Sequence, residues 1–240
     1  MKKFASLLMM FMAIGLGATL TSCSDDKDAH DEYLAIATVI PGTGNTGCTL
    51  KVDKNTILRP VNITLAPDAK ESRAFIRYYK TDNQAGGNAT DVQLTWMDKM
   101  LTKDLAENKG EDNKNTYGDD GVVIYDDWCT VAEDGYLTLH FGTYFGSTGI
   151  SHSINLVNVS SAEHPYKYRL YHNANGDAKG YKSDGYVSFK IFDRADCDKD
   201  ATIELEWNDF GQVKTVKFQH NPVFTAQKNA ATPVAAKSVE

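Results

Sequence analysis

The chain has 240 residues and a formal net charge of −7, which becomes −9 once residues 1–22, with two lysines and no acid, are removed. An acidic chain without a basic stripe is not expected to bind nucleic acid, because phosphate backbones repel it. The 12 Tyr, 10 Phe and 3 Trp can fill hydrophobic cores, so the composition excludes a wholly disordered chain.

The first residues predict an export signal that ends at a lipid-modified cysteine. Two lysines precede an uncharged apolar run over residues 7–20, and small residues lead to Cys23. This pattern defines a secretory signal peptide, residues 1–22, and the apolar run is too short to span a bilayer. The tetrapeptide LTSC that ends at Cys23 resembles the lipobox of bacterial lipoproteins. We therefore expect cleavage before Cys23 and a membrane anchor of lipid on its sulfur.

An acidic segment follows this cysteine, and it consists of Ser24, Asp25, Asp26, Lys27 and Asp28. It resembles the signal that sends some lipoproteins to the outer face of the outer membrane. Residues 23–32 also have the composition of a solvated, extended tether. We expect an outer-membrane lipoprotein that is exposed at the cell surface, with the periplasmic face as the alternative.

The next part of the chain alternates short apolar runs with polar turns, which is typical of β-strands. The expected strands cover residues 33–40, 48–52, 57–65, 72–80 and a segment that begins at 91. Pro60 marks an edge or a bulge. The stretch 98–108 is the longest piece of the chain whose pattern fits a helix.

A polar segment over residues 103–121 is typical of a linker between domains. We place the first domain at 33–105, the linker at 106–121 and the second domain at 122–225. Residues 226–240 lack apolar periodicity and are expected to form a disordered tail.

The second domain shows clearer alternation than the first. Its expected strands include 136–141, 153–159, 166–172, 186–192, 202–207 and 213–219. In the clearest of them, Leu137, Leu139 and Phe141 share one face, opposite Tyr136 and His140. Many short strands at regular spacing predict an all-β protein, built as a sandwich or a barrel.

The chain resembles the NigD-like lipoproteins. The resemblance is carried by the lipobox with its acidic segment, by the stretch DEYLAIATV at residues 31–39, and by the strand patterns at 136–141, 154–157 and 202–219. It implies an N-terminal OB-like β-barrel followed by a C-terminal antiparallel β-sandwich. The segment 55–60 departs from the family pattern because it lacks a glycine.

Three cysteines remain after lipidation, namely Cys48, Cys129 and Cys197. Their number is odd, so at least one thiol stays free even if export permits a disulfide. None has a Cys-x-x-Cys or Cys/His spacing, which argues against zinc. We interpret all three as small buried apolar residues.

The acidic stretch at residues 196–200 resembles the start of a calcium loop. It carries Asp at alternate positions, but Ala201 and Trp207 stand where such a loop needs Gly and Glu. The histidines have no metal-ligand spacing, and no nucleophile motif is present. We therefore expect no metal, no cofactor and no catalytic residue.

Aromatic and acidic residues in two loops are the candidate ligand contacts: Tyr125, Asp126, Asp127, Trp128, Tyr144 and Phe145. Aromatic rings can stack on a partner while carboxylates accept hydrogen bonds, although acidic turns are also ordinary solvated loops.

We expect a non-enzymatic lipoprotein that binds a protein or another component of the envelope. A glycan-binding accessory protein or a polysaccharide-processing enzyme is the alternative from another class. A bacteriocin-associated role, which only the family's name implies, is the third.

Overall fold

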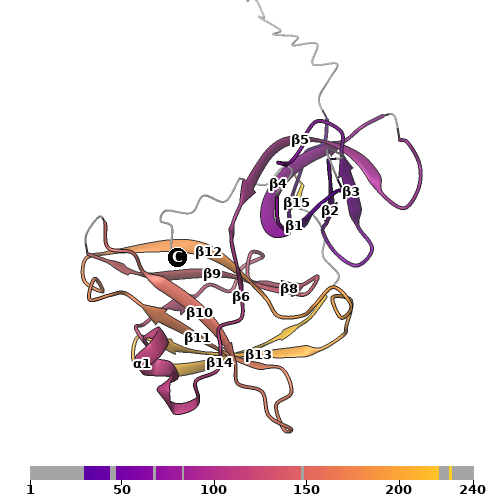
Figure 1. Cartoon of the computed structure of the whole chain (residues 1–240). Helices are drawn as coiled ribbons and strands as arrows, with labels where there is room; N and C mark the ends of the chain where they lie inside the picture. Colours follow the sequence, from indigo (N-terminus) through magenta and orange to yellow (C-terminus); the bar gives the residue numbers. More distant parts are fainter. Residues whose placement is uncertain are drawn as a thin grey trace, which may run out of the picture.

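The chain folds almost entirely into β-strands, as its alternating pattern predicts (Figure 1). The computed structural model describes residues 30–43, 47–66, 69–82, 84–146, 149–221 and 227–228. Within these ranges, helix is confined to the 3-10 turn η1 (Gly110–Asp112) and to α1 (Asn113–Tyr117). No helix in the described ranges is long and apolar enough to cross a membrane.

The N-terminal part is a closed five-stranded barrel. Its strands are β1 (Tyr33–Pro41), β2 (Cys48–Lys51), β3 (Ile57–Pro60), β4 (Ser72–Lys80) and β5 (Thr90–Lys99). They neighbour one another in the order β1-β2-β3-β5-β4, and β4 pairs back onto β1 from Tyr33↔Tyr78 to Val39↔Ser72. Closure leaves few free edges, and alternate residues of each strand point inward. The expected OB-like barrel is thereby confirmed.

The C-terminal part is a sandwich of two sheets. One contains β6 (Leu101–Asp104), β12 (Tyr181–Lys190), β9 (Tyr136–Phe145) and β7 (Val123–Ile124), with β8 (Val131–Glu133) also paired to β9. The other contains β10 (Ser153–Asn158), β11 (Lys167–Asn173), β13 (Thr202–Asp209) and β14 (Gln212–Gln219). Leu137, Leu139 and Phe141 lie in the core between the sheets, as their spacing predicts.

The helix expected over residues 98–108 is wrong. β5 pairs with β4 as far as Lys99, and β6 then joins the sandwich, parallel to β12 from Leu101↔Val187. Pairing with distant strands decides the structure here, and the periodicity of one segment does not contain that information. The chain passes from barrel to sandwich at Met100, before the boundary that we placed at residue 105.

The polar residues that we expected as a linker, 106–121, pack on the sandwich. Ala106 bridges to Val157, and the amide of Asn108 donates to the carbonyl of Asn158 at 2.9 Å. The ring of Tyr117 lies 6.1 Å from that of Tyr171. Apart from this ring contact, side-chain amides and backbone groups hold the segment in place, and apolar periodicity in the sequence does not indicate contacts of that kind.

One strand lies inside the segment that we expected to be a disordered tail. β15 (Gln227–Lys228) pairs with Tyr33 and Leu34 of β1. The other partner on this side of β1, β2, begins its pairing only at Thr38, so the start of β1 has an open edge there. Backbone hydrogen bonds to an open edge require no apolar side chain, which is why the sequence pattern misses this strand.

The barrel sits against one end of the sandwich (Figure 1). Ile36 and Phe75 from the barrel pack with Met100, Cys129 and Val131 in one apolar cluster. Both faces of β9 are consequently buried near its start, where Tyr136 and Thr138 are shielded from solvent. At this contact Arg73 of β4, fully buried, forms an ion pair with Glu133 of β8. Burial raises the pKa of Glu133 to about 7, and the Arg73 guanidinium opposes that rise.

Candidate functional site

The far half of the same sheet carries a polar and aromatic surface that the barrel leaves uncovered. Strand alternation places His140 and Tyr144 of β9 on its outer side, and the β12 residues paired with Gly142 and Tyr144 are Asp184 and Lys182. Together with Tyr125, which lies across β9, these side chains form the surface that we call the open face: Tyr125, His140, Tyr144, Lys182 and Asp184.

His140 lies at the centre of the open face, held from every side. Its Nδ1 is 2.6 Å from Oδ2 of Asp127, and its Nε2 is 2.9 Å from Oδ2 of Asp184. The rings of Tyr125 and Tyr186 each lie 4.4 Å from the imidazole. Both ring nitrogens therefore face carboxylates, and these contacts fix the orientation of the imidazole on this surface.

A glycine makes room for Tyr125. A Cβ atom at Gly142 would lie 2.5 Å from Oη of Tyr125 and 3.0 Å from its Cζ. The phenol therefore rests directly on the backbone of β9, and Lys182 Nζ lies 5.4 Å from the centre of its ring. The lysine and the histidine thus both lie against this phenol, which fixes its orientation.

The edge of the open face carries an exposed aromatic pair. Tyr144 and Phe210 make an edge-to-face contact, with ring centres 5.4 Å apart, and Phe210 is 47 % exposed. Phe210 occupies the tip of the β13–β14 hairpin with φ 48°, followed by Gly211 with φ 96°. A bulky residue in this left-handed region is uncommon and costs free energy, and Asn is the residue usually favoured there.

The candidate contacts from the sequence divide into two groups. Tyr125, Asp127 and Tyr144 come together on or beside the open face, and Asp126 is exposed next to them. Trp128 instead packs on Phe75 of the barrel, with ring centres 6.0 Å apart.

Phe145, the remaining candidate contact, is buried against His152 and therefore does not reach the surface. The reason is that β9 extends through Phe145, which pairs with Tyr181, and alternation turns Phe145 inward. The pattern alone did not identify His140, Asp184 or Phe210, because only the pairing of β9 with β12 and the hairpin turn bring them to this face.

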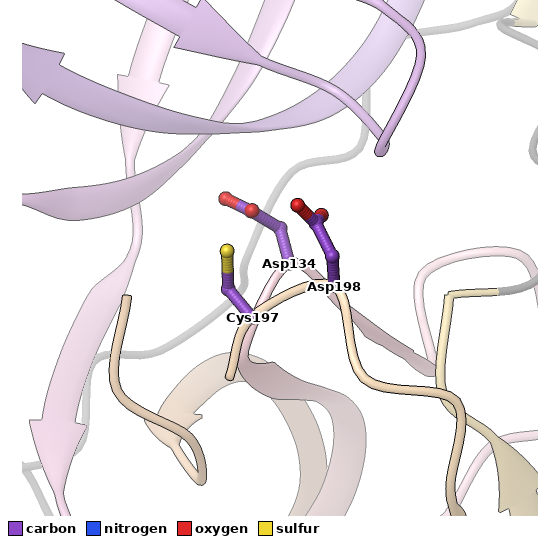
Figure 2. A group of neighbouring side chains, drawn as sticks. All are labelled: Asp134, Cys197 and Asp198. Carbon is purple, nitrogen blue, oxygen red and sulfur yellow. The ribbon is translucent and has the colours of Figure 1, made fainter. Parts of the chain in front are cut away.

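A second cluster has the donor types of a metal site (Figure 2). Carboxylate oxygens of Asp134 and Asp198 and Sγ of Cys197 lie within 4.8 Å of one another. Lys51 of the barrel already reaches into this group, with Nζ 2.9 Å from both carboxylates and 3.5 Å from Sγ. Its ammonium supplies the positive charge that a cation would bring, so these residues do not fit a resident metal.

The three cysteines within the described ranges are free and buried. Burial raises the pKa of the Cys129 thiol to about 12, and it also raises the pKa values of Cys48 and Cys197. These are the small buried thiols that the sequence predicts. Cys23 and residues 24–28 lie outside the described residues, so lipidation and export remain predictions.

Comparison with known proteins places the second half of the chain in a family. Residues 104–220 match the NigD-like C-terminal beta sandwich domain, which confirms the resemblance for this part of the chain. A comparison with curated protein sequences found no match.

Solved structures support the fold of the whole described chain. A protein from Parabacteroides distasonis described as toxin-related is 26 % identical, with a TM-score of 0.64 over 80 % of this chain and 94 % of that one. A protein of unknown function from Bacteroides vulgatus is 24 % identical, with a TM-score of 0.63 over 80 % and 92 %. A NigD-like immunity protein from Bacteroides caccae is 20 % identical, with a TM-score of 0.54 over 79 % and 96 %. The last two similarities concern the fold alone.

Proposed function

We propose that the chain is a non-enzymatic lipoprotein of the bacterial envelope that binds a protein partner through the open face. The observation that carries this proposal is Phe210, a bulky side chain kept exposed at a hairpin tip in a backbone conformation that disfavours it. Such a cost at an exposed position points to a function for the side chain. Tyrosine and other large aromatic residues at the centre of a surface are typical anchors of protein interfaces.

The charges around the open face narrow the kind of partner. Asp127 and Asp184 contact His140, the exposed Asp126 precedes Asp127 in the sequence, and Lys182 lies opposite Tyr144. We therefore propose a partner whose contact surface offers hydrogen-bond donors or basic side chains beside an apolar pocket for the Tyr144 and Phe210 rings.

A chemical cross-linking pull-down of the tagged, lipidated protein from intact cells tests the proposal. The double variant Tyr144→Ser with Phe210→Asn removes both rings, and asparagine suits the turn better than phenylalanine, so folding is retained. We expect the wild type and a Lys214→Ala control to recover one dominant partner that the double variant loses. Recovery of the same proteins by all three would contradict the proposal.

A glycan ligand is the second candidate, because exposed tyrosine rings also stack on sugars and the nearby carboxylates accept hydroxyl groups. It is favoured if the pull-down recovers no protein while glycan binding depends on Tyr144. The packing of Trp128 on Phe75 and of Tyr125 on β9 removes two of the rings on which this alternative relied.

The proposal includes the location of the protein in the cell envelope. We infer that lipid on Cys23 anchors the chain at the outer membrane and that residues 24–28 direct it to the cell surface. Labelling with radioactive palmitate should be lost in Cys23→Ser, and protease added to intact cells should digest the wild type. An undigested protein would place it on the periplasmic side.

A further inference from the structure

A cleft of about 680 Å³ lies where the barrel meets the sandwich. Its walls come from the start of β4, from the crossover between β5 and β6, and from the paired ends of β9 and β12, Tyr136 and Lys190. Four lysines converge on this cleft: Lys70, Lys99, Lys103 and Lys190. The open face lies on the other half of the same sheet, so the cleft is a separate site.

The lining is positively charged although the chain as a whole is acidic. Two carboxylates, Glu71 and Asp104, accompany the four lysines. Glu71 is already engaged, because it accepts a hydrogen bond from Oη of Tyr136 at 2.6 Å and pairs with Arg194 at 3.2 Å. The cleft therefore has more cationic than anionic groups available to a ligand.

Three of the lysines, Lys70, Lys99 and Lys190, have no strong ion pair among the described residues. Lys190 pairs with Asp193 at 3.3 Å, but that carboxylate is 89 % exposed, and such pairs contribute little. Lys70 and Lys99 have no ion pair among the described residues. Ser72 also lines the cleft, and its Oγ is buried with no hydrogen-bond partner in the described part of the chain.

We propose that this cleft binds a phosphate group carried by a small polar ligand, either a dissolved sugar phosphate or the headgroup of a phospholipid. Ammonium groups are compact point charges that commonly bind phosphate, and they do so without the planar fork by which arginine holds carboxylates and phosphates. The volume lies in the range of natural ligand sites, and Met100 and Leu101 line the cleft beside the charges.

Two double variants of the chain from residue 24 onward, which keeps every described residue, test the proposal. The cleft variant, Lys99→Ala with Lys190→Ala, removes two positive charges from the cleft. The control variant, Lys54→Ala with Lys214→Ala, removes two positive charges from exposed sites elsewhere. Calorimetric titration with glucose 6-phosphate measures the dissolved source. Sedimentation with vesicles that contain phosphatidylglycerol, against vesicles of phosphatidylcholine alone, measures the headgroup.

We expect the wild type and the exposed-site control to bind one of these probes alike, and the cleft variant to bind it at least about tenfold more weakly. Binding of the sugar phosphate identifies a dissolved ester, and binding of anionic vesicles alone identifies a headgroup. The proposal is overturned if neither probe binds, if the two double variants bind equally, or if glucuronic acid binds as tightly as the sugar phosphate.

Discussion

Lys51 of the barrel and Asp134 of the sandwich form an ion pair of 2.9 Å across the contact between the two parts, and the Asp134 side chain is completely buried. Arg194 donates to both carboxylate oxygens of Asp134, at 3.1 and 3.0 Å. Burial alone would favour the neutral acid, but hydrogen bonds from Thr38 and Lys51 hold the pKa of Asp134 below its ordinary value. One carboxylate thus ties the barrel to the sandwich.

Replacing Lys51 with methionine should lower the free energy of unfolding by up to about 3 kcal/mol, because it removes one of the two cations that pair with the buried Asp134, and Arg194 remains as the other. Urea unfolding of the mature chain measures the change. Lys214→Met is the control, since Lys214 pairs with Asp209 at an exposed hairpin end and should cost less than about 1 kcal/mol. Equal losses in the two variants would show that the Lys51 contact does not stabilise the fold.

The stability of the fold should fall as the pH drops below about 6.5, in part through His172. Burial, with the neighbouring His152, lowers the pKa of His172 to about 4. The unfolded chain takes up this proton near pH 6.5, whereas the folded chain resists it until about pH 4. The contribution is complete above pH 6.5 and is lost on acidification, by about 3 kcal/mol at pH 4.

Unfolding of the wild type and of His172→Gln, followed from pH 7.5 to 4, isolates this residue from the other titrating groups. The variant should lose less stability over this range, whereas His164→Gln, at an exposed position, should follow the wild type. An equal loss of stability in all three proteins would show that His172 does not cause the pH dependence.

The thiols should be inert in the folded protein. Cys48, Cys129 and Cys197 are buried, and their raised pKa values keep them protonated at neutral pH, whereas the thiolate is the reactive form. A chain that lacks Cys23 should show almost no reaction with a thiol reagent until denaturant is added, and then three equivalents. Rapid labelling of one thiol without denaturant would show that its site opens readily.

Gly142→Ala should disturb the open face and leave the fold intact. The new methyl group displaces the Tyr125 phenol, at a cost of about 1–2 kcal/mol for overpacking. The NMR signals of the His140 ring should shift as Tyr125 moves away. Adding Tyr125→Phe removes the hydroxyl oxygen that lies closest to the new methyl group, and it should restore the His140 signals in part. Unchanged His140 signals in Gly142→Ala would show that Tyr125 does not lie on Gly142.

The local patterns of the sequence identify the strands well, because each strand has one face toward a core. The residues 72–80 alternate and form β4 with the expected bounds, and 136–141 lie within β9 with the expected inward face. Alternation does not say which strands pair, so the transfer of residues 101–104 to the second sheet and the pairing of β15 with β1 were not predictable from it.

The candidate site was predicted only in part, again because the sequence pattern does not show which strands pair. Tyr125, Asp127 and Tyr144 are aromatic or acidic residues in turn-like sequence, and they meet on one surface. His140 and Asp184 are 44 residues apart and become neighbours only through the register of β9 with β12. Trp128 has the composition of a contact residue, but the barrel covers it, and the sequence of one domain does not reveal which face the other domain occupies.

The most direct test of the proposed function places a photoreactive amino acid at position 144 of the lipidated protein in living cells, with position 214 on the opposite sheet as the control. If the open face binds a protein, irradiation should join position 144 to one discrete partner, and position 214 should give no such product. Adducts from position 214 alone, or the same adducts from both positions, would contradict the assignment of the open face as the binding surface.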